Sequence, residues 1–178
     1  NPQAGSRFEE ASRRGVDIII ALDVSRSMLA EDIQPNRLER ARLSLTRLID
    51  RLDQDRVGVV LFAGSAITQV PLTADHRAAR MLLRGISTES VPVQGTAIGS
   101  AIDRAIQSFD NEANRSRVLI ILSDGENHLD DPLAAAKRAH EQGIAIHTVG
   151  IGTSAGAPIP VYRNGQLTGF FRDRDGQT

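Results

Sequence analysis

Carboxylate and hydroxyl side chains recur in this sequence at spacings that suit a divalent metal ion. Asp23, Ser25 and Ser27 are separated by one residue each. Farther along, Thr96 follows a glutamine-glycine pair, and Asp124 begins an Asp-Gly-Glu sequence. Mg²⁺ prefers octahedral oxygen coordination and usually keeps several waters, so one or two carboxylates with neutral hydroxyls suit it. We therefore predict that these five residues hold Mg²⁺, with Mn²⁺ and Ca²⁺ as alternative ions.

Helix capping is the simpler interpretation of the same side chains. Serine and threonine hydroxyls often cap helices, and aspartates often accept hydrogen bonds from N–H groups at helix starts. Any one of the five residues alone would be assigned to that role. Their joint occurrence beside predicted strand ends favours a metal site. A purely structural domain that has lost its site is the second alternative.

Four short runs of the sequence have the composition of strands buried on both faces of a parallel sheet, since they are nearly continuous in apolar residues and rich in valine and isoleucine. These runs span residues 16–22, 56–62, 117–122 and 144–151. Apolar residues at helical spacing predict helices over 38–52, 75–84, 96–109 and 132–142. The alternation predicts an α/β, doubly wound, Rossmann-like fold with a mainly parallel sheet and helices on both faces.

Two further segments are predicted to be antiparallel. Residues 65–70 follow the strand 56–62 after only two residues, and so short a link permits only a hairpin, which gives one antiparallel edge strand. Residues 159–172 form a second predicted hairpin, turning at Asn164-Gly165. We expect residues 1–15 to be a polar lead-in and residues 16–178 to be a single domain that includes this hairpin.

The predicted sheet explains why distant residues would meet. In open parallel sheets, ligands bind at the carboxyl ends of the strands. Asp23 ends the first predicted strand and Asp124 follows the third. Alternation along an extended loop would place Asp23, Ser25 and Ser27 on one side of the chain. Thr96 would open a helix from a separate loop, and the hairpin at 159–172 should leave the same edge of the sheet.

Other polar residues near these positions are candidates for surrounding the ion or facing a partner. They are Arg26, Glu31, Asp32, Glu126, Asn127 and His128. For Arg26 the alternative is a solvated surface cation. For Glu31 and Asp32 it is a solvated pair near the positive end of a helix dipole.

Composition removes several other classes of function. The 21 basic residues nearly balance the 22 acidic ones, so the charge gives no support to nucleic-acid binding. The chain has no cysteine, which excludes disulfides and thiolate metal sites. No apolar run approaches the roughly 18 to 20 residues needed to cross a bilayer, so this segment is not expected to span a membrane.

The Asp23, Ser25, Ser27, Thr96 and Asp124 pattern resembles the metal-ion-dependent adhesion site (MIDAS) of the von Willebrand factor A family. Residues 21–28, 30–41 and 121–127 look like the bacterial aerotolerance-type (Bat) membrane proteins of that family. The resemblance runs from about residue 16 to residue 151 and more loosely to 175. It departs at Arg26, where many relatives have glycine.

This resemblance implies a non-enzymatic protein-binding domain. Ser25, Ser27 and Thr96 would contact the metal directly, and Asp23 and Asp124 directly or through water. A glutamate or aspartate of a partner protein would fill the open position. The parent would be a bacterial inner-membrane protein with this domain in the periplasm, and its partners other membrane or periplasmic proteins of a complex linked to stress and aerotolerance.

The enzymatic alternative is a Mg²⁺-dependent, phosphatase-like hydrolase that uses Asp23. Haloacid-dehalogenase-type phosphatases also place a strand-end aspartate beside Mg²⁺, but they usually need D-x-D, and here the second position is Ser25. Such a phosphatase would also need a lysine downstream, and the only lysine is Lys137, which lies within a predicted helix. A serine hydrolase is also disfavoured, because the sequence around Ser65 is not the nucleophile elbow G-x-S-x-G.

Overall fold

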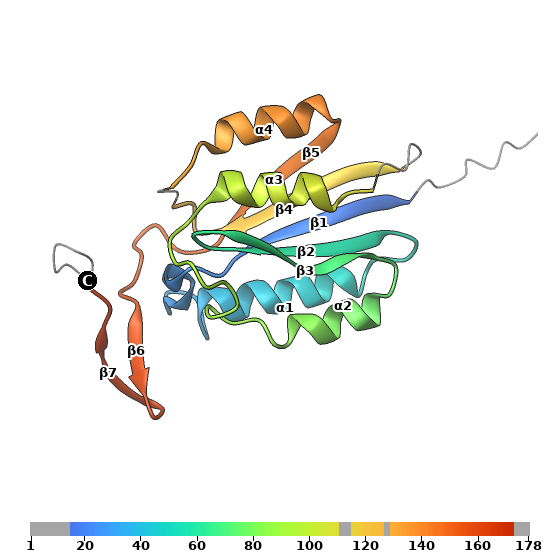
Figure 1. Ribbon diagram of the computed structural model, residues 1–178. Helices are drawn as coiled ribbons and strands as arrows, with labels where there is room; N and C mark the ends of the chain where they lie inside the picture. Colours follow the sequence, from blue (N-terminus) through green and yellow to red (C-terminus); the bar gives the residue numbers. More distant parts are fainter. Residues whose placement is uncertain (1–14, 111–114, 127–128, 173–178) are drawn as a thin grey trace, which may run out of the picture.

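The computed structural model describes residues 15–110, 115–126 and 129–172 (Figure 1). In this part of the chain a five-stranded sheet lies between two pairs of helices, and a two-stranded hairpin extends from one end. This architecture confirms the predicted doubly wound α/β fold.

The central sheet has the order β3-β2-β1-β4-β5. Its strands are β1 (Val16–Asp23), β2 (Arg56–Phe62), β3 (Ala66–Thr73), β4 (Ser116–Ser123) and β5 (Ile144–Gly150). Strand β1 pairs in parallel with both β2 and β4, and β4 pairs in parallel with β5. Strand β3 pairs antiparallel with β2 at the edge, as predicted, although it begins at Ala66 and the link therefore has three residues rather than two. Because the parallel strands share one direction, their carboxyl ends lie together.

The helices cover both faces of the sheet (Figure 1). One pair comprises α1 (Arg37–Ile49) and α2 (His76–Leu83), and the other α3 (Ile98–Ser108) and α4 (Pro132–Glu141). Side chains of β1 alternate between two apolar cores: Ile20 and Leu22 pack with α1, and Ile19 and Ala21 pack with α3. None of the helices in the described ranges is long and apolar enough to cross a membrane.

Two predictions about local backbone were wrong. The chain does not stay extended through Ser27, because residues Arg26–Leu29 form a short 3-10 helix, η1. The turn carries Met28 into the core, where its side chain is fully buried. Helix α3 begins at Ile98 rather than at Thr96, because the backbone of Ala97 is not helical (φ −123°, ψ 81°). The N–H of Ala97 donates to the carbonyl of Ala63 (2.8 Å), which ties this residue to the end of β2. Thr96 therefore belongs to the loop.

The predicted hairpin is present beyond the sheet. It consists of β6 (Pro160–Arg163) and β7 (Gln166–Phe170). Asn164 and Gly165 have positive φ angles of 51° and 76°, which is the backbone that a two-residue type I′ turn requires. In Figure 1 the hairpin lies at the end of the molecule that also carries η1, so it leaves the expected edge of the sheet.

Candidate metal centre

Asp23 is the buried carboxylate at the centre of the candidate site. It ends β1 and has no solvent exposure. Its Oδ1 accepts a hydrogen bond from the N–H of Ser25 (2.9 Å), and its Oδ2 accepts one from the hydroxyl of Ser123 (2.7 Å). Burial raises the pKa of Asp23 to about 6 in spite of these hydrogen bonds, and the charge of nearby Asp124 acts in the same direction. A cation beside this carboxylate would favour its charged form.

Ser25 and Ser27 place two hydroxyls beside Asp23. Their Oγ atoms lie 3.0 Å apart, brought together by the 3-10 turn rather than by extended alternation. Ser25 is 3% exposed and stands at the N-cap position of η1, yet its hydroxyl makes no capping hydrogen bond. Capping therefore does not account for Ser25. Its oxygen is available to a ligand.

Thr96 reaches the same edge of the sheet from the loop before α3. It is 3% exposed. The N-cap of α3 is Ala97, without a side-chain capping bond, so Thr96 is not a helix cap either. In the part of the chain that the structure describes, no side-chain hydrogen bond joins Thr96 to the other four residues. Its place is set by the backbone.

The approach of the Thr96 loop depends on a glycine at the end of β2. A Cβ atom at Gly64 would lie 2.4 Å from the carbonyl oxygen of Gln94, a contact that real Cβ atoms essentially never make. The N–H of Gly64 donates to the carbonyl of Val93 (2.8 Å). On the other side, the N–H of Val24 donates to the carbonyl of Phe62 (2.8 Å). These bonds hold the loops after β1 and β2 and the Thr96 loop at one edge.

Asp124 follows β4 and is held by a residue that the sequence analysis missed. Its Oδ2 accepts a hydrogen bond from Nη1 of Arg37 (3.0 Å). The same guanidinium donates to both oxygens of Asp32 (2.8 and 2.9 Å), and Asp32 accepts from the N–H of Thr153 (2.7 Å). Hydrogen bonds from Arg37 hold the pKa of Asp32 well below its usual range. Asp32 is thus not the solvated helix-entry residue of the alternative interpretation.

The position of Arg37 in the sequence carries only a partial signal, because its burial and its partners become visible in the fold. It is the first residue of α1, after the Asn36 cap, where the helix dipole disfavours a cation. Arg37 is 8% exposed. A buried arginine at a helix N-terminus needs acidic partners. In the fold these partners are Asp32 and Asp124.

The remaining candidates lie around the site in different ways. Arg26 is exposed, with its guanidinium 5.4 Å from the centre of the Phe171 ring. Glu31 accepts a hydrogen bond from the hydroxyl of Tyr162 (2.9 Å), so it is tied to the hairpin rather than to a helix start. Glu126 is exposed, and its N–H donates to Asp124 Oδ1 (3.4 Å). The two other predicted residues, Asn127 and His128, lie outside the described residues.

The ligand set at this edge is dominated by hydroxyls. Within the described ranges, no three histidine, cysteine or acidic side chains come together as a metal cluster. A carboxylate-rich cage of the kind that Ca²⁺ favours is therefore not what these residues offer. Two carboxylates and the hydroxyls of Ser25, Ser27 and Thr96 fit an ion that keeps some of its waters.

Comparison with known proteins identifies a family, and two bacterial structures are among those similar to this chain. Residues 17–160 match the family model of the von Willebrand factor type A domain. An aerotolerance-related membrane protein from Bacteroides fragilis is 45% identical, with a TM-score of 0.86 over 92% of this chain and 79% of that chain. BatB from Bacteroides thetaiotaomicron, described as a conserved hypothetical protein, is 48% identical, with a TM-score of 0.85 over 92% and 78%.

Curated relatives are longer than this chain. A UPF0353 protein from Mycolicibacterium paratuberculosis is 29% identical over 154 residues, which cover 78% of this chain and 46% of the relative. The chain spans about half the length of the curated relatives it matches. The proximal thread matrix protein 1 of mussel byssus has been solved with zinc in its MIDAS motif. It is 23% identical, with a TM-score of 0.67 over 77% of this chain and 36% of that chain. A likeness at this level of identity shows the fold alone.

Proposed function

This chain belongs to the von Willebrand factor type A domain family, and we propose that it binds a partner protein through a divalent metal ion at the carboxyl edge of its sheet. Asp23, Ser25, Ser27, Thr96 and Asp124 hold the ion, and a glutamate or aspartate of the partner completes its coordination. The strongest support is the group of buried Asp23 with the paired hydroxyls of Ser25 and Ser27, of which Ser25 caps no helix.

The charge balance of the site favours an external carboxylate. Ser25, Ser27 and Thr96 contribute neutral oxygens, so only two protein carboxylates offset the charge of the ion. One of these, Asp124, already shares its charge with Arg37. A bound divalent ion supplies the positive charge that attracts the partner's acid. Asp23, held by Ser25 and Ser123, fixes the position of that charge.

Mg²⁺ is the ion that we propose, with Mn²⁺ and Ca²⁺ as alternatives. A small set of carboxylates combined with hydroxyls and waters suits the octahedral preference of Mg²⁺ better than the larger oxygen cages of Ca²⁺. The zinc in the mussel protein belongs to that protein. It supports the idea that this fold can hold a divalent ion at the corresponding motif.

A binding role is better supported than catalysis. Both carboxylate oxygens of Asp23 are engaged by hydrogen bonds, and the side chain has no solvent exposure. A phosphatase-like mechanism needs this carboxylate to attack phosphorus and needs a second acid where Ser25 stands. The enzymatic alternative predicts turnover of generic phosphate esters that is lost in Asp23→Ala, and a panel of such substrates tests it.

The similarity to an aerotolerance-related membrane protein supports a location beside a membrane. We propose that this domain lies on the periplasmic side of a bacterial inner membrane. Its partners there are other membrane or periplasmic proteins of a complex linked to stress tolerance. Affinity capture from membranes, with and without chelator and with Asp23→Ala as control, should yield partners that depend on both the metal and Asp23.

Calorimetric titration with Mg²⁺ and Mn²⁺ tests the metal site itself. We expect Asp23→Ala and Ser25→Ala each to abolish the binding heat while circular dichroism shows an intact fold. Asp53→Ala and Ser100→Ala, which change exposed residues of the same types, should bind as the wild type does. Unchanged affinity in both site variants would refute the assignment.

A further inference from the structure

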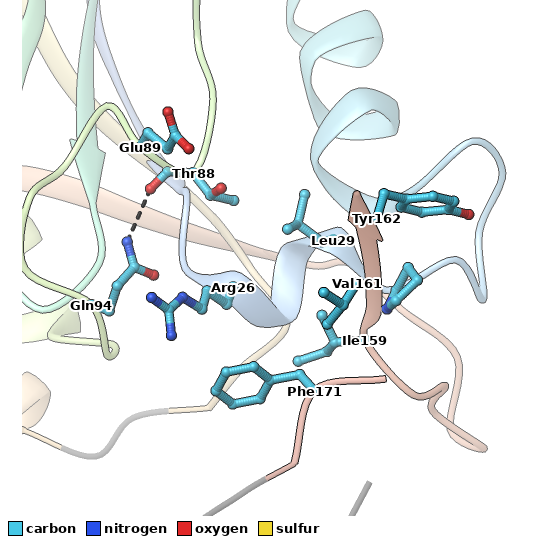
Figure 2. Close-up of a pocket in the computed structure, with 10 residues that line it drawn as sticks. Arg26, Leu29, Thr88, Glu89, Gln94, Ile159, Val161, Tyr162 and Phe171 are labelled. Atoms are coloured by element: carbon cyan, nitrogen blue, oxygen red, sulfur yellow. Dashed lines mark hydrogen bonds between the residues drawn. The ribbon is translucent and has the colours of Figure 1, made fainter. Parts of the chain in front are cut away.

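A hollow of about 370 Å³ has lining residues that neighbour the predicted metal ligands in the chain. Figure 2 shows the side chains that line it. The hollow is bounded by η1, by the loop of residues 88–94 and by the hairpin. One wall is apolar and contains Leu29 of η1 with Ile159, Val161 and Phe171, and Figure 2 shows these side chains gathered on one side. The volume is at the small end of the roughly 300–1,000 Å³ typical of ligand pockets, so it suits one large side chain.

Residues that line the hollow adjoin the predicted metal ligands. Arg26 stands between Ser25 and Ser27 in the chain, and Gln94 precedes Thr96 by two residues. The metal position and the hollow therefore share η1 and the Thr96 loop. A single short segment of a partner can reach both.

The charge on this surface favours an acidic segment. Arg26 is exposed, and among the described residues no carboxylate forms an ion pair with it; its guanidinium instead lies over the ring of Phe171. A metal ion at the neighbouring ligands adds to this positive charge. Glu89 on the opposite side of the hollow is the one acidic side chain in the described lining. Complementary charge guides an acidic partner to this edge.

Gln94 carries a buried acceptor at the edge of the hollow. Its Nε2 donates to the carbonyls of Thr88 (3.0 Å) and Val91 (3.4 Å), which fixes the orientation of the amide. The Oε1 atom is buried and has no hydrogen-bond partner in the described part of the chain. Buried acceptors are nearly always satisfied in native structures. A bound segment reaches this acceptor only by displacing the side chains that cover it.

We propose that the hollow takes an aromatic or branched aliphatic side chain from the same partner segment whose carboxylate reaches the metal. This inference rests on the proposed function and names the partner: an acidic peptide with a large apolar residue within a few positions of its acid. The hairpin is then part of the binding surface. The hydrogen bond from the Tyr162 hydroxyl to Glu31 (2.9 Å) holds the hairpin, and with it the apolar wall of the hollow, in place.

Short synthetic peptides of fixed composition test the proposal. The probes are capped peptides with one glutamate and one phenylalanine, separated by zero, one or two glycines in either order. Matched controls replace the phenylalanine with alanine or the glutamate with glutamine. Binding to the ¹⁵N-labelled chain is followed by NMR in saturating Mg²⁺ and again in chelator. We expect at least one phenylalanine-glutamate peptide to bind about fivefold or more tightly than its alanine control, as burial of a large apolar side chain allows.

Two neighbouring phenylalanines provide a matched pair of variants. Phe171 lines the hollow, whereas Phe170 does not line it and is 46% exposed. Phe171→Ala should reduce the advantage of the phenylalanine peptide to less than about twofold, since its apolar contact is lost. Phe170→Ala should leave the advantage unchanged, and neither variant should alter Mg²⁺ binding.

The outcomes separate this inference from the function on which it rests. If Mg²⁺ alone moves no resonance of Ser25, Ser27 or Thr96, the metal site is wrong. If Mg²⁺ binds but the phenylalanine adds no affinity, or no peptide binds, only the use of the hollow is overturned. Equal binding of the glutamine control in chelator would show an independent apolar pocket, which also overturns the shared segment.

Discussion

The two aspartates of β1 show how partners decide the role of a buried carboxylate. Asp17, at the start of the strand, accepts hydrogen bonds from Arg56 (2.9 and 2.6 Å) and Arg115 (2.6 Å). Burial alone would raise the pKa of Asp17, but the two guanidinium groups together lower it. Asp23, at the end of the strand, has only hydroxyl and amide donors, and its pKa is raised. We infer that Asp17 stabilises the fold and that Asp23 serves a cation.

Replacing Asp17 should therefore cost stability and leave the metal site intact. Asp17→Asn removes the carboxylate that pairs with Arg115 and one of the carboxylates that pair with Arg56, which keeps its ion pair with Asp110. We expect a loss of about 2–3 kcal/mol in the free energy of unfolding. Urea denaturation measures this loss, and calorimetry should show Mg²⁺ affinity as in the wild type. A stability change below about 1 kcal/mol would contradict the contrast between the two aspartates.

Asp23 should make the metal-free domain less stable as pH rises. Its pKa in the folded state is about 6, above its ordinary value near 3.8, so the folded state binds the proton more tightly. The stabilisation contributed by the Asp23 carboxyl is then fully present below about pH 4 and is lost as pH rises through about 6, by about 3 kcal/mol in total. Urea denaturation at a series of pH values, with a chelator to keep the domain metal-free, measures this decline. Asp23→Asn should remove it. Parallel pH profiles for the two proteins would contradict the raised pKa.

Individual residues were the most predictable part of the candidate site. The spacing of Asp23, Ser25 and Ser27, with Thr96 and Asp124 downstream, was visible in the sequence, and the structure places all five at one edge of the sheet. Their role as metal ligands stays a prediction. Arg37 was missed because its partners lie 5 and 87 positions away in the chain, and only the folded helix brings them together.

At the scale of elements, strands were easier to predict than the turns between them. Buried parallel strands have continuous apolar runs, and β2 matches its predicted bounds. Strand β1 is longer than predicted by one residue at its end, and β4 by one residue at each end. The 3-10 turn η1 gives no such signal, because it forms to bury Met28 and depends on tertiary packing. The start of α3 was missed for the same kind of reason, because the non-helical backbone of Ala97 is set by packing against the residues after β2.

The contact between β2 and the Thr96 loop gives an element-scale prediction. Gly64→Ala would push a Cβ into the carbonyl of Gln94, so we expect a loss of about 1–3 kcal/mol in stability together with weaker metal binding. Gly85→Ala is the matched control, because its Cβ meets no atom within 4 Å. Thermal melts compare the stability of the two variants, and calorimetry compares their Mg²⁺ affinity. Equal behaviour of both variants would show that the close approach does not position Thr96.

Arg37 joins α1 to the loops after β4 and β5. Arg37→Lys keeps the charge but loses the fork that holds Asp124 and Asp32 together, so we expect Mg²⁺ affinity to fall by about tenfold or more. Arg42→Lys, on the same helix, should bind Mg²⁺ normally, because Arg42 pairs with Glu39 instead. If Arg37→Lys also binds normally, the guanidinium does not position Asp124.

At the scale of the whole molecule, the site exists because the topology gathers three distant segments. Residues 23–27, 96 and 124 follow or flank the carboxyl ends of neighbouring strands β1, β2 and β4. The strand pattern alone predicted that meeting point. The hollow formed with the hairpin could not be predicted, since the sequence gives the turn at Asn164 but not the direction in which the hairpin packs.

Crystals of the chain grown with Mn²⁺ give the most direct test of the central claim, because the anomalous signal locates the ion. We predict one strong peak at bonding distance from the hydroxyls of Ser25, Ser27 and Thr96, with Asp23 and Asp124 bound directly or through water, and no peak in Asp23→Ala crystals. A peak elsewhere, or none at saturating Mn²⁺, would contradict a metal-dependent binding site at this edge.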